Sequence, residues 1–370
     1  MVYYIPRIIF TEEWNFIMNS FNQLNNINIK EIAALPSPEE IRLEHQLSLE
    51  AGARVISYRR QVMDILDGKD SRLMVITGPC SIHNPDAAFK YAEKLKALSD
   101  KVSDHLLILM RCYFEKPRTT VGWKGLLTDP DLDDSCDIAR GIRLSRDVLT
   151  RVAETGLPAA TEILDPILAQ YVADCITWTA IGARTTEAQT HRQLASGLSM
   201  PVGFKNATDG ATQTAIDAVL AARSHHSFLG VLEDGTVGVF RTNGNPYAHI
   251  VMRGGAGHTN YGPEYIAYLR VVLRRSGLPT GIVIDCSHAN SGKDYRKQRI
   301  ALDGVLEQIA SGETAIRGVM LESNLKPGSQ KVVPGITPDP EVSITDGCID
   351  WEETEELIMK TRETVKKARG

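Results

Sequence analysis

Short apolar runs alternate with amphipathic stretches along most of the chain from Leu73 onward. Apolar runs bounded by Gly, Pro or polar residues are typical of strands buried on both faces, and helical periodicity is typical of the stretches between them. The pattern predicts strands at residues 73–77, 106–110, 158–162, 180–183, 201–205, 227–231, 281–285 and 318–322. It predicts helices between them at residues 85–99, 137–155, 166–176, 187–197, 212–223, 263–276 and 294–311.

Eight strands that alternate with helices over roughly 250 residues are the count of a closed (β/α)8, or TIM, barrel, which is an α/β fold. An open doubly wound sheet is the alternative. However, Gly78-Pro-Cys-Ser follows the first strand, where a dinucleotide-binding sheet has GxGxxG. The barrel is therefore the predicted fold.

Other segments depart from this alternation. Residues 18–37 form a polar arm in which residues 27–32 can add a short edge strand, and Pro36 to Pro38 begin a helix that runs to about Leu66. Residues 236–242 and 249–252 flank Asn243-Gly-Asn-Pro and are predicted to form an inserted β-hairpin near 236–252. A loop rich in Pro, Gly and Ser at 326–345 precedes a closing helix near 351–368.

The predicted organisation has three parts: an N-terminal extension at 1–26, an arm and helix at 27–70, and a catalytic barrel at 71–370 with the hairpin and the C-terminal helix. The first ten residues are apolar but interrupted by Pro6 and Arg7, and they lack the basic segment and cleavage site of a signal peptide. Because Met18 precedes the polar arm, residues 1–17 are consistent with a surplus extension from an upstream start.

Composition narrows the class of protein. The 370 residues are 43% hydrophobic and 24% charged, with a formal net charge of -5 and a pI of about 6.0, so a nucleic-acid partner is not expected. No apolar stretch approaches the ~20 residues that a membrane span requires. The six cysteines include no CxxC pair, which is typical of a reduced, cytoplasmic protein.

Candidate chemistry collects where the predicted strands end, and in a barrel these ends share one mouth. The residues at or just after the strand ends are Cys80, Arg111, Glu162, Arg184, Lys205, Asp285, His288 and Glu322, and Arg253 follows the end of the predicted hairpin. Each has an ordinary explanation when taken alone: Cys80 as a small buried apolar residue, His288 as a structural histidine. Their coincidence on one predicted rim favours a functional site.

The strand-end residues divide into two chemistries. Arg111, Arg184, Lys205, Arg253 and the basic loop 116–124 supply more cations than one phosphate needs, which indicates two anionic ligands or one ligand with both carboxylate and phosphate. Cys80, His288 and Glu322, with Asp346 from the later loop, form a candidate site for a divalent transition metal: Mn, Fe, Co or Zn. A metal beside an anion clamp points to metal-assisted formation or cleavage of a C–C bond in phosphorylated substrates.

Seven motifs carry a family resemblance: GPCSIH at 78–83, KPRTTVGWKG at 116–125, GARTT at 182–186, PVGFK at 201–205, RGG at 253–255, DCSH at 285–288 and SITD at 343–346. With these motifs the chain resembles the class I, microbial-type 3-deoxy-D-arabino-heptulosonate 7-phosphate (DAHP) synthases, from about residue 27 to the C-terminus. The resemblance implies a metal-dependent aldol-type condensation of phosphoenolpyruvate with erythrose 4-phosphate that releases phosphate. This reaction is the first step of the shikimate pathway to chorismate.

The resemblance also implies a role for each matching residue. Four metal ligands are implied: Cys80, His288, Glu322 and Asp346. Phosphoenolpyruvate would be held by Arg111, Arg184, Lys205 and Arg253, by the amides of Gly182 and Ala183, and through water by Glu162. Erythrose 4-phosphate would be held by Lys116, Arg118 and Thr119. Catalysis would involve Lys116, which is placed to protonate the developing alkoxide, with Cys80 and His288.

Members of the family are usually inhibited by an aromatic amino acid, and a homodimer or homotetramer is expected. The effector positions correspond here to Gln170, Ser199, Phe228 and Gly230, although ordinary packing explains the same residues. Gly230 leaves more room than a serine and favours tyrosine as the effector. Two alternatives are a related synthase that uses arabinose 5-phosphate and a non-catalytic barrel that senses an aromatic amino acid. The KPRTT motif and the N-terminal arm argue against the first, and the complete set of ligands and cations argues against the second.

Overall fold

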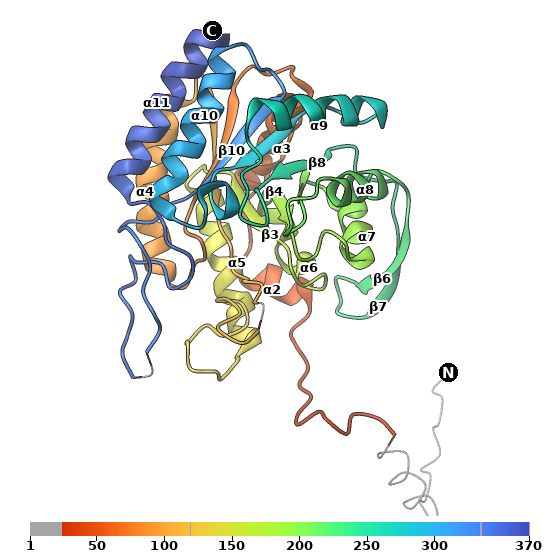
Figure 1. Cartoon of the computed structure of the whole chain (residues 1–370). Coiled ribbons are helices and arrows are strands. Elements are labelled where there is room, and N and C mark those ends of the chain that lie inside the picture. The colour runs from red at the N-terminus through yellow and green to blue at the C-terminus, as the bar shows by residue number, and fades with distance from the viewer. Residues whose placement is uncertain (1–23, 119, 334, 370) are drawn as a thin grey trace, which may run out of the picture. The chain divides into compact units, whose positions relative to one another are not determined.

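The computed structural model describes residues 24–118, 120–333 and 335–369, and eight of its strands form a closed parallel barrel (Figure 1). Around the barrel the order is β1, β2, β3, β4, β5, β8, β9 and β10, and β10 pairs with β1 to close it. These strands are β1 (Leu73–Gly78), β2 (Leu106–Arg111), β3 (Ala159–Glu162), β4 (Ile176–Ile181), β5 (Val202–Lys205), β8 (Ala248–Met252), β9 (Ile282–Asp285) and β10 (Ile316–Glu322). The predicted (β/α)8 barrel is confirmed.

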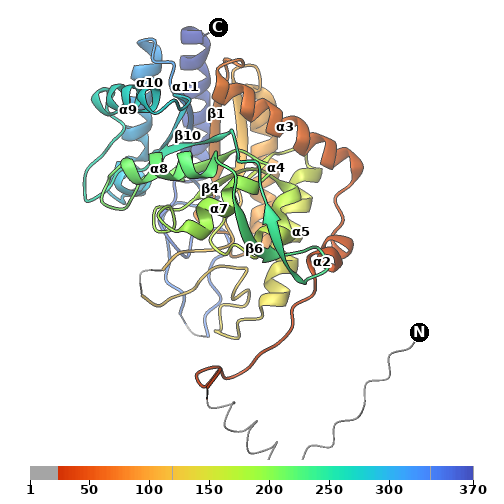
Figure 2. The ribbon, with the colours of Figure 1, turned by 90° about the vertical axis from the view of Figure 1, so that its right-hand side faces the viewer.

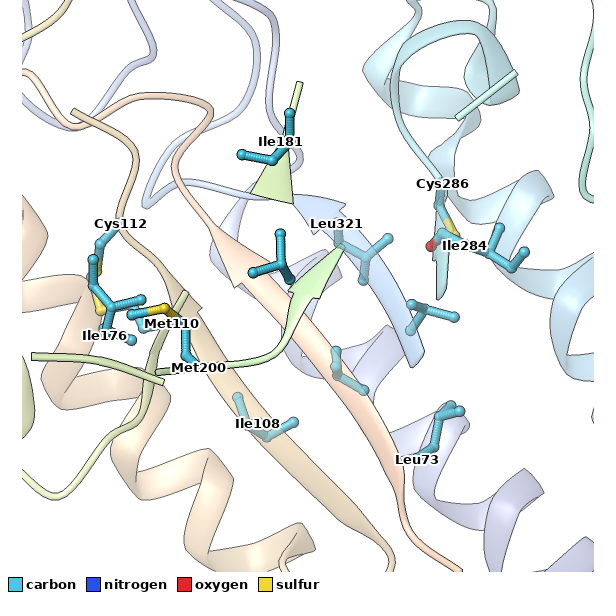
Figure 3. Close-up of a cluster of buried hydrophobic side chains, with 14 of the residues drawn as sticks. Leu73, Ile108, Met110, Cys112, Ile176, Ile181, Met200, Ile284, Cys286 and Leu321 are labelled. Atoms are coloured by element: carbon cyan, nitrogen blue, oxygen red, sulfur yellow. Dashed lines mark hydrogen bonds between the residues drawn. The ribbon is translucent and has the colours of Figure 1, made fainter. Parts of the chain in front are cut away.

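Helices cover the outside of the barrel. They are α4 (Pro85–Val102), α5 (Ile138–Glu154), α6 (Ala169–Val172), α7 (Gln189–Gly197), α8 (Gln213–Ala222), α9 (Pro263–Arg275), α10 (Gln298–Ala310) and α11 (Trp351–Arg369). Short 3-10 turns occur at Ala173–Cys175, His288–Ser291 and Tyr295–Lys297. Apolar strand residues such as Ile108, Met110 and Ile176 belong to the buried cluster that joins strands to helices (Figure 3). The strands are buried on both faces because the helices cover one face and the barrel interior the other.

A second apolar cluster fills the barrel interior and is closed at the amino-terminal end by α3 (Leu49–Asp67). Val62, Ile65 and Leu66 of α3 pack there with inward-facing strand residues. The largest of these is Trp178, whose ring requires glycine at position 203: a Cβ on Gly203 would lie 2.4 Å from it. The barrel is thus a packed core rather than a pore.

The N-terminal helix is interrupted, which the sequence did not predict. α2 (Pro38–Glu44) begins with a capping box between Ser37 and Glu40, and α3 begins anew at Ser48, whose side chain accepts a hydrogen bond from the Ala51 N–H. Two N-caps close together define two helices, because each Ser satisfies amide groups that a continuous helix would use internally.

The predicted inserted hairpin near 236–252 is wrong in its position. The hairpin is formed by β6 (Ser227–Val231) and β7 (Val237–Arg241), which pair antiparallel, whereas β8 is the sixth barrel strand, between β5 and β9. Residues 227–231 were predicted as that barrel strand. No residue of β6 is buried, whereas every residue of β8 is buried, so burial on both faces distinguishes the barrel strand from the hairpin strand.

Smaller differences concern element boundaries. β4 begins at Ile176 rather than at residue 180, and the predicted helix 166–176 is reduced to α6 and a 3-10 turn. Residues 27–32 form no strand in the described part of the arm, which contains a turn closed by the Ile29 amide and the Asn26 carbonyl, 2.9 Å apart. Residues 1–17 lie outside the described residues. No helix within the described ranges is long and apolar enough to cross a bilayer.

Candidate active site

A cavity of about 460 Å³ opens at the carboxyl ends of the barrel strands. Its lining includes Arg111, Lys116, Arg118, Glu162, Ala183, Arg184, Lys205, Arg253, His288, Glu322 and Asp346. These residues lie at the carboxyl ends of strands and in the loops that follow, far apart in the sequence, and the barrel brings them together in one cavity. Two other predicted site residues, Gly182 and Cys80, are buried and do not line the cavity themselves.

Two of the cations are held inside the protein by carboxylates. The Arg111 side chain is 1% exposed; it pairs with Glu322 at 2.9 Å and donates from Nε to the Pro79 carbonyl. Lys205 is 3% exposed and contacts Glu162 at 3.0 Å and Asp285 at 3.6 Å. Burial lowers the pKa of Lys205, but these carboxylates more than offset it, so the net shift is upward. Arg111 and Lys205 are therefore fixed, charged groups facing the cavity.

Three predicted metal ligands form a cluster. The ligand atoms of Cys80, Glu322 and Asp346 lie within 4.8 Å of one another. Cys80 follows β1 and Glu322 ends the adjacent β10, while the loop that carries Asp346 is attached through a 2.7 Å hydrogen bond between the Ser81 and Thr345 hydroxyls. Burial, with Glu322 beside it, raises the pKa of the Cys80 thiol to about 11. A thiol and two carboxylates are a donor set that suits a divalent transition metal.

His288, the fourth predicted ligand, lies in the same cavity but outside that cluster. Its Nδ1 is 2.9 Å from Asp285 and 3.0 Å from the Ser287 hydroxyl, and its backbone has a left-handed φ of 54°. Although burial opposes ionisation, His288 and Lys205 hold the pKa of Asp285 well below its usual range. Asp285 thus orients the imidazole through Nδ1, as carboxylates do for metal-binding histidines.

The loop after β2 brings Lys116 to the cluster. Lys116 Nζ lies 2.9 Å from Cys80 Sγ and 3.7 Å from Asp346, while its backbone amide donates to the Lys124 carbonyl. Arg118 is exposed and donates from Nε to the Trp123 carbonyl at 2.8 Å. Thr119 lies outside the described residues, so its predicted contact is not addressed by the structure.

Comparisons with known proteins agree with this arrangement. The sequence model of the DAHP synthetase I family matches residues 42–359. The chain belongs to the DAHP synthetase I family. It is 47% identical over 338 residues to the Tyr-sensitive phospho-2-dehydro-3-deoxyheptonate aldolase of Escherichia coli, with 91% of this chain and 95% of that relative covered. It is 48% identical over 348 residues to the Phe-sensitive enzyme of the same species, with 94% and 99% covered.

The fold of this family member is also that of a solved relative. The phospho-2-dehydro-3-deoxyheptonate aldolase of Francisella tularensis has a TM-score of 0.90 and 45% sequence identity to it, over 93% of this chain and 100% of that one. The family and the enzyme class predicted from the seven motifs are therefore confirmed. Tyr-sensitive and Phe-sensitive relatives are similar to this chain to almost the same degree, so overall identity does not select the effector.

The predicted effector residues of this DAHP synthetase lie on three segments. Gln170 is on α6, exposed Ser199 lies between α7 and β5, and Phe228 and Gly230 are on β6. Phe228 stacks on Phe240 with the ring centroids 5.8 Å apart. A Cβ at Gly230 would lie 2.7 Å from the Phe240 ring, so packing within the hairpin gives glycine a reason to be there that does not depend on an effector.

Sequence reasoning missed Tyr113 as a site residue. Its ring lies 3.6 Å from the Arg111 guanidinium and 5.6 Å from Lys205 Nζ, and its buried hydroxyl has no hydrogen-bond partner among the described residues. The strand period of two places it on the same side as Arg111, which is a signal that could have found it. Tyr113 thus forms an aromatic floor under the two buried cations.

Proposed function

We propose that this chain condenses phosphoenolpyruvate with D-erythrose 4-phosphate and water to give 3-deoxy-D-arabino-heptulosonate 7-phosphate and phosphate. The observation that carries the proposal is the juxtaposition of buried Arg111 and Lys205 with the cluster of Cys80, Glu322 and Asp346 in one cavity. An anion site beside a metal site is what the joining of an enol phosphate to a phosphorylated aldehyde requires.

The cations bind and orient phosphoenolpyruvate. Arg111, Lys205 and Arg253 line the cavity as buried residues, and Arg184 lines it as an exposed residue at its rim. Gly182 lies against Glu162: a Cβ there would be 2.5 Å from the carboxylate, so only glycine lets Glu162 and Lys205 pair beside the phosphate site. Four preorganised positive charges offset the repulsion between two phosphorylated substrates, which is mainly a contribution to positioning.

The chemistry of the donor set fits a metal, and Cys80, His288, Glu322 and Asp346 would hold it. A bound divalent cation supplies a Lewis acid that withdraws electron density from the aldehyde oxygen. Asp285 presents His288 through its Nδ1 contact, and the Ser81–Thr345 hydrogen bond holds the Asp346 loop against the barrel. Titration of the metal-free protein with Mn, Fe, Co and Zn, with activity as the readout, identifies the metal among these four.

Lys116 is the proposed proton donor. C3 of the enol phosphate attacks the aldehyde carbon, and the oxygen of that aldehyde takes a proton from Lys116 Nζ. Water then adds at C2 and returns one proton to Lys116 Nζ, and the tetrahedral adduct expels phosphate, which takes the proton of the C2 hydroxyl as the ketone forms. Arg118 and Thr119 are proposed to hold the phosphate of erythrose 4-phosphate, since Arg118 lies on the exposed side of the same cavity.

One assay tests the proposal. Phosphate release is measured on mixing the two substrates, with and without EDTA and with each aromatic amino acid. We expect release that EDTA abolishes and that divalent metal restores; an unchanged rate after chelation would refute the metal assignment. Arabinose 5-phosphate, run in parallel, should give little product, and a rate equal to that with erythrose 4-phosphate would favour the alternative synthase.

Two further proposals concern the regulation and the oligomeric state of this chain. We expect inhibition by an aromatic amino acid at a site that includes Gln170, Ser199, Phe228 and Gly230, with tyrosine favoured, and a homodimer or homotetramer in the cytoplasm. Inhibition by phenylalanine but not tyrosine would overturn the choice of effector.

A further inference from the structure

Two arginines lie together at the amino-terminal end of the barrel, at the opposite end from the cavity. Arg317 is near the start of β10 and Arg369 ends α11, which reaches the same end of the barrel as α3 in both views (Figures 1 and 2). Arg369 donates to the carbonyls of Ile316 and Ser71, so it is anchored beside Arg317. The two residues form what we call the arginine pair.

The Arg317 guanidinium is held in place by close packing. A Cβ on Gly68 would lie 2.4 Å from Arg317 Nη2, and one on Gly281 would lie 3.2 Å from Arg317 Cγ. Both glycines therefore leave the room that the Arg317 side chain occupies. Its Nε is buried and has no hydrogen-bond partner among the described residues. This Nε is closed off from solvent while the residue as a whole is half-buried, so a ligand would meet the terminal nitrogens of the guanidinium rather than Nε.

Nearby carboxylates do not neutralise the arginine pair. The negative charge of Glu313 attracts both guanidiniums. However, both of its oxygens already have partners: Oε2 pairs with Arg270 at 2.8 Å, and Oε1 accepts from the Ala315 amide at 2.7 Å. Within the described ranges neither Arg317 nor Arg369 has a carboxylate in ion-pair range. The pKa of Arg369 is lowered to about 10, mainly because the side chain is buried and in addition because the Arg317 charge repels it.

The acids of the adjacent turn are occupied by cations of their own: Asp67 pairs with Lys69 at 2.7 Å and Asp70 with Arg72 at 2.6 Å. The C-terminus of α3 offers the equivalent of about half a negative charge to Arg317, which is the ordinary structural explanation for an arginine there. Among the residues that the structure describes, three arginines against one glutamate leave a local excess of two positive charges, and half a charge does not balance it.

We propose that Arg317 and Arg369, with Arg270 behind them, form a binding site for a small phosphate dianion, either inorganic phosphate or a phosphate monoester. Guanidinium forks match phosphate oxygens in geometry, and a dianion equals the excess charge. The site is separate from the catalytic cavity, because Arg317 precedes Glu322 by five strand residues, roughly 16 Å at the rise of a β-strand. It does not depend on the proposed reaction.

Calorimetric titration of the full chain with inorganic phosphate, and separately with glycerol phosphate, tests the proposal. The catalytic cavity also holds cations, so we expect two sites per chain in the wild type. Arg317→Gln and Arg369→Gln should each weaken one of them by at least about tenfold, the loss expected for one bidentate, charge-assisted contact. Binding of only one of the two probes would identify the source of the phosphate.

Arg299→Gln is the matched control, because Arg299 is a surface arginine that already pairs with Glu353 and Glu356. It should keep both sites, and Arg317→Gln should keep kcat and the KM for phosphoenolpyruvate within about twofold, since the site lies away from the chemistry. A single site in the wild type, or two unchanged sites in both arginine variants, would overturn the proposal. If either Arg317→Gln or Arg369→Gln fails to fold, the titration of the other variant tests the proposal.

Discussion

Lys116 is the residue whose surroundings argue most directly for a chemical role. Its ammonium group lies 2.9 Å from Cys80 Sγ and 3.7 Å from Asp346, where the proposed anion site meets the candidate metal ligands. Lys116→Met keeps the length of the side chain and removes its proton. We expect kcat to fall by about 10²–10⁴-fold, the usual contribution of general acid catalysis, while the affinity for phosphoenolpyruvate changes little. Steady-state kinetics measure both, and a normal kcat would exclude Lys116 as the acid.

His249 makes the folded state sensitive to acid. It is buried, its Nδ1 contacts the Tyr247 carbonyl at 2.9 Å, and its Nε2 accepts from the Trp178 indole at 3.1 Å. Burial lowers its pKa from 6.5 to about 4, so the folded state holds it neutral. Its contribution to stability is present above pH 6.5 and is lost as the pH falls toward 4. By linkage it amounts to up to about 3 kcal/mol.

Urea unfolding at pH 6.5 and pH 4 measures this effect. His249→Gln cannot titrate, so the difference in unfolding free energy between the two pH values should shrink. His225→Gln, at an exposed histidine, is the control and should leave that difference as in the wild type. An equal loss of stability in His249→Gln and the wild type would show that other groups cause the acid sensitivity.

The sequence predicts well which charged residues lie at the strand ends, but it predicts poorly which atoms these residues contact. Arg111 and Lys205 were predictable because charged residues that directly follow buried strands must face the mouth of a barrel. The position of His288 outside the cluster was not, because it depends on a left-handed backbone and on a contact with Asp285. Such details arise from packing between segments, which no spacing along one segment records.

At the scale of single elements, β4 and β5 show how one glycine fits the barrel interior. A Cβ on Gly203 would lie 2.4 Å from Trp178 and 2.6 Å from Val251. Gly203→Ala should therefore destabilise the fold by roughly 1–3 kcal/mol through overpacking. Gly52→Ala is the matched control: the nearest atom is Leu47 Cδ2 at 3.8 Å and the site is helical, so alanine should stabilise it by up to about 1 kcal/mol. Equal shifts of Tm in the two variants would contradict this account.

The errors of sequence reasoning occur where two elements share one local pattern. β6 and β8 are both short apolar runs, and only the tertiary position of β8 between β5 and β9 makes it a barrel strand. Residues 27–32 have the composition of a strand but form none in the described chain. Long amphipathic helices such as α5 and α10 were predicted well, because their periodicity is set by the one face that they bury.

At the scale of the whole molecule, the two ends of the barrel have different tasks. The carboxyl ends of the strands carry exposed loops and charged side chains, whereas the amino-terminal end is closed by α3 and by contacts within the core. Charges enclosed beside the cavity, such as Lys205 with Glu162 and Asp285, are costly to bury, which is why we assign them to the proposed chemistry. Residues that hold α3 in place serve the fold alone.

The same substitution at the two ends separates these tasks. Arg59 of α3 donates three hydrogen bonds to the carbonyls of Ala173 and Ile176, at 2.6–2.9 Å. Arg59→Met leaves both carbonyls short of donors and should cost roughly 1–3 kcal/mol of unfolding free energy while kcat and KM stay within about twofold. Arg184 is exposed on the rim of the cavity, so Arg184→Met should change stability by no more than about 0.5 kcal/mol.

The activity of Arg184→Met should fall instead, with a higher KM for phosphoenolpyruvate, because the variant lacks one of the four cations that we propose hold this substrate. Denaturant unfolding and steady-state kinetics on the same two proteins give the comparison. Loss of activity in Arg59→Met without loss of stability would show that α3 acts on the cavity through the barrel. We expect the opposite pattern: Arg59→Met loses stability and keeps activity, and Arg184→Met loses activity and keeps stability. This is the pattern of a barrel whose two ends evolved under different constraints.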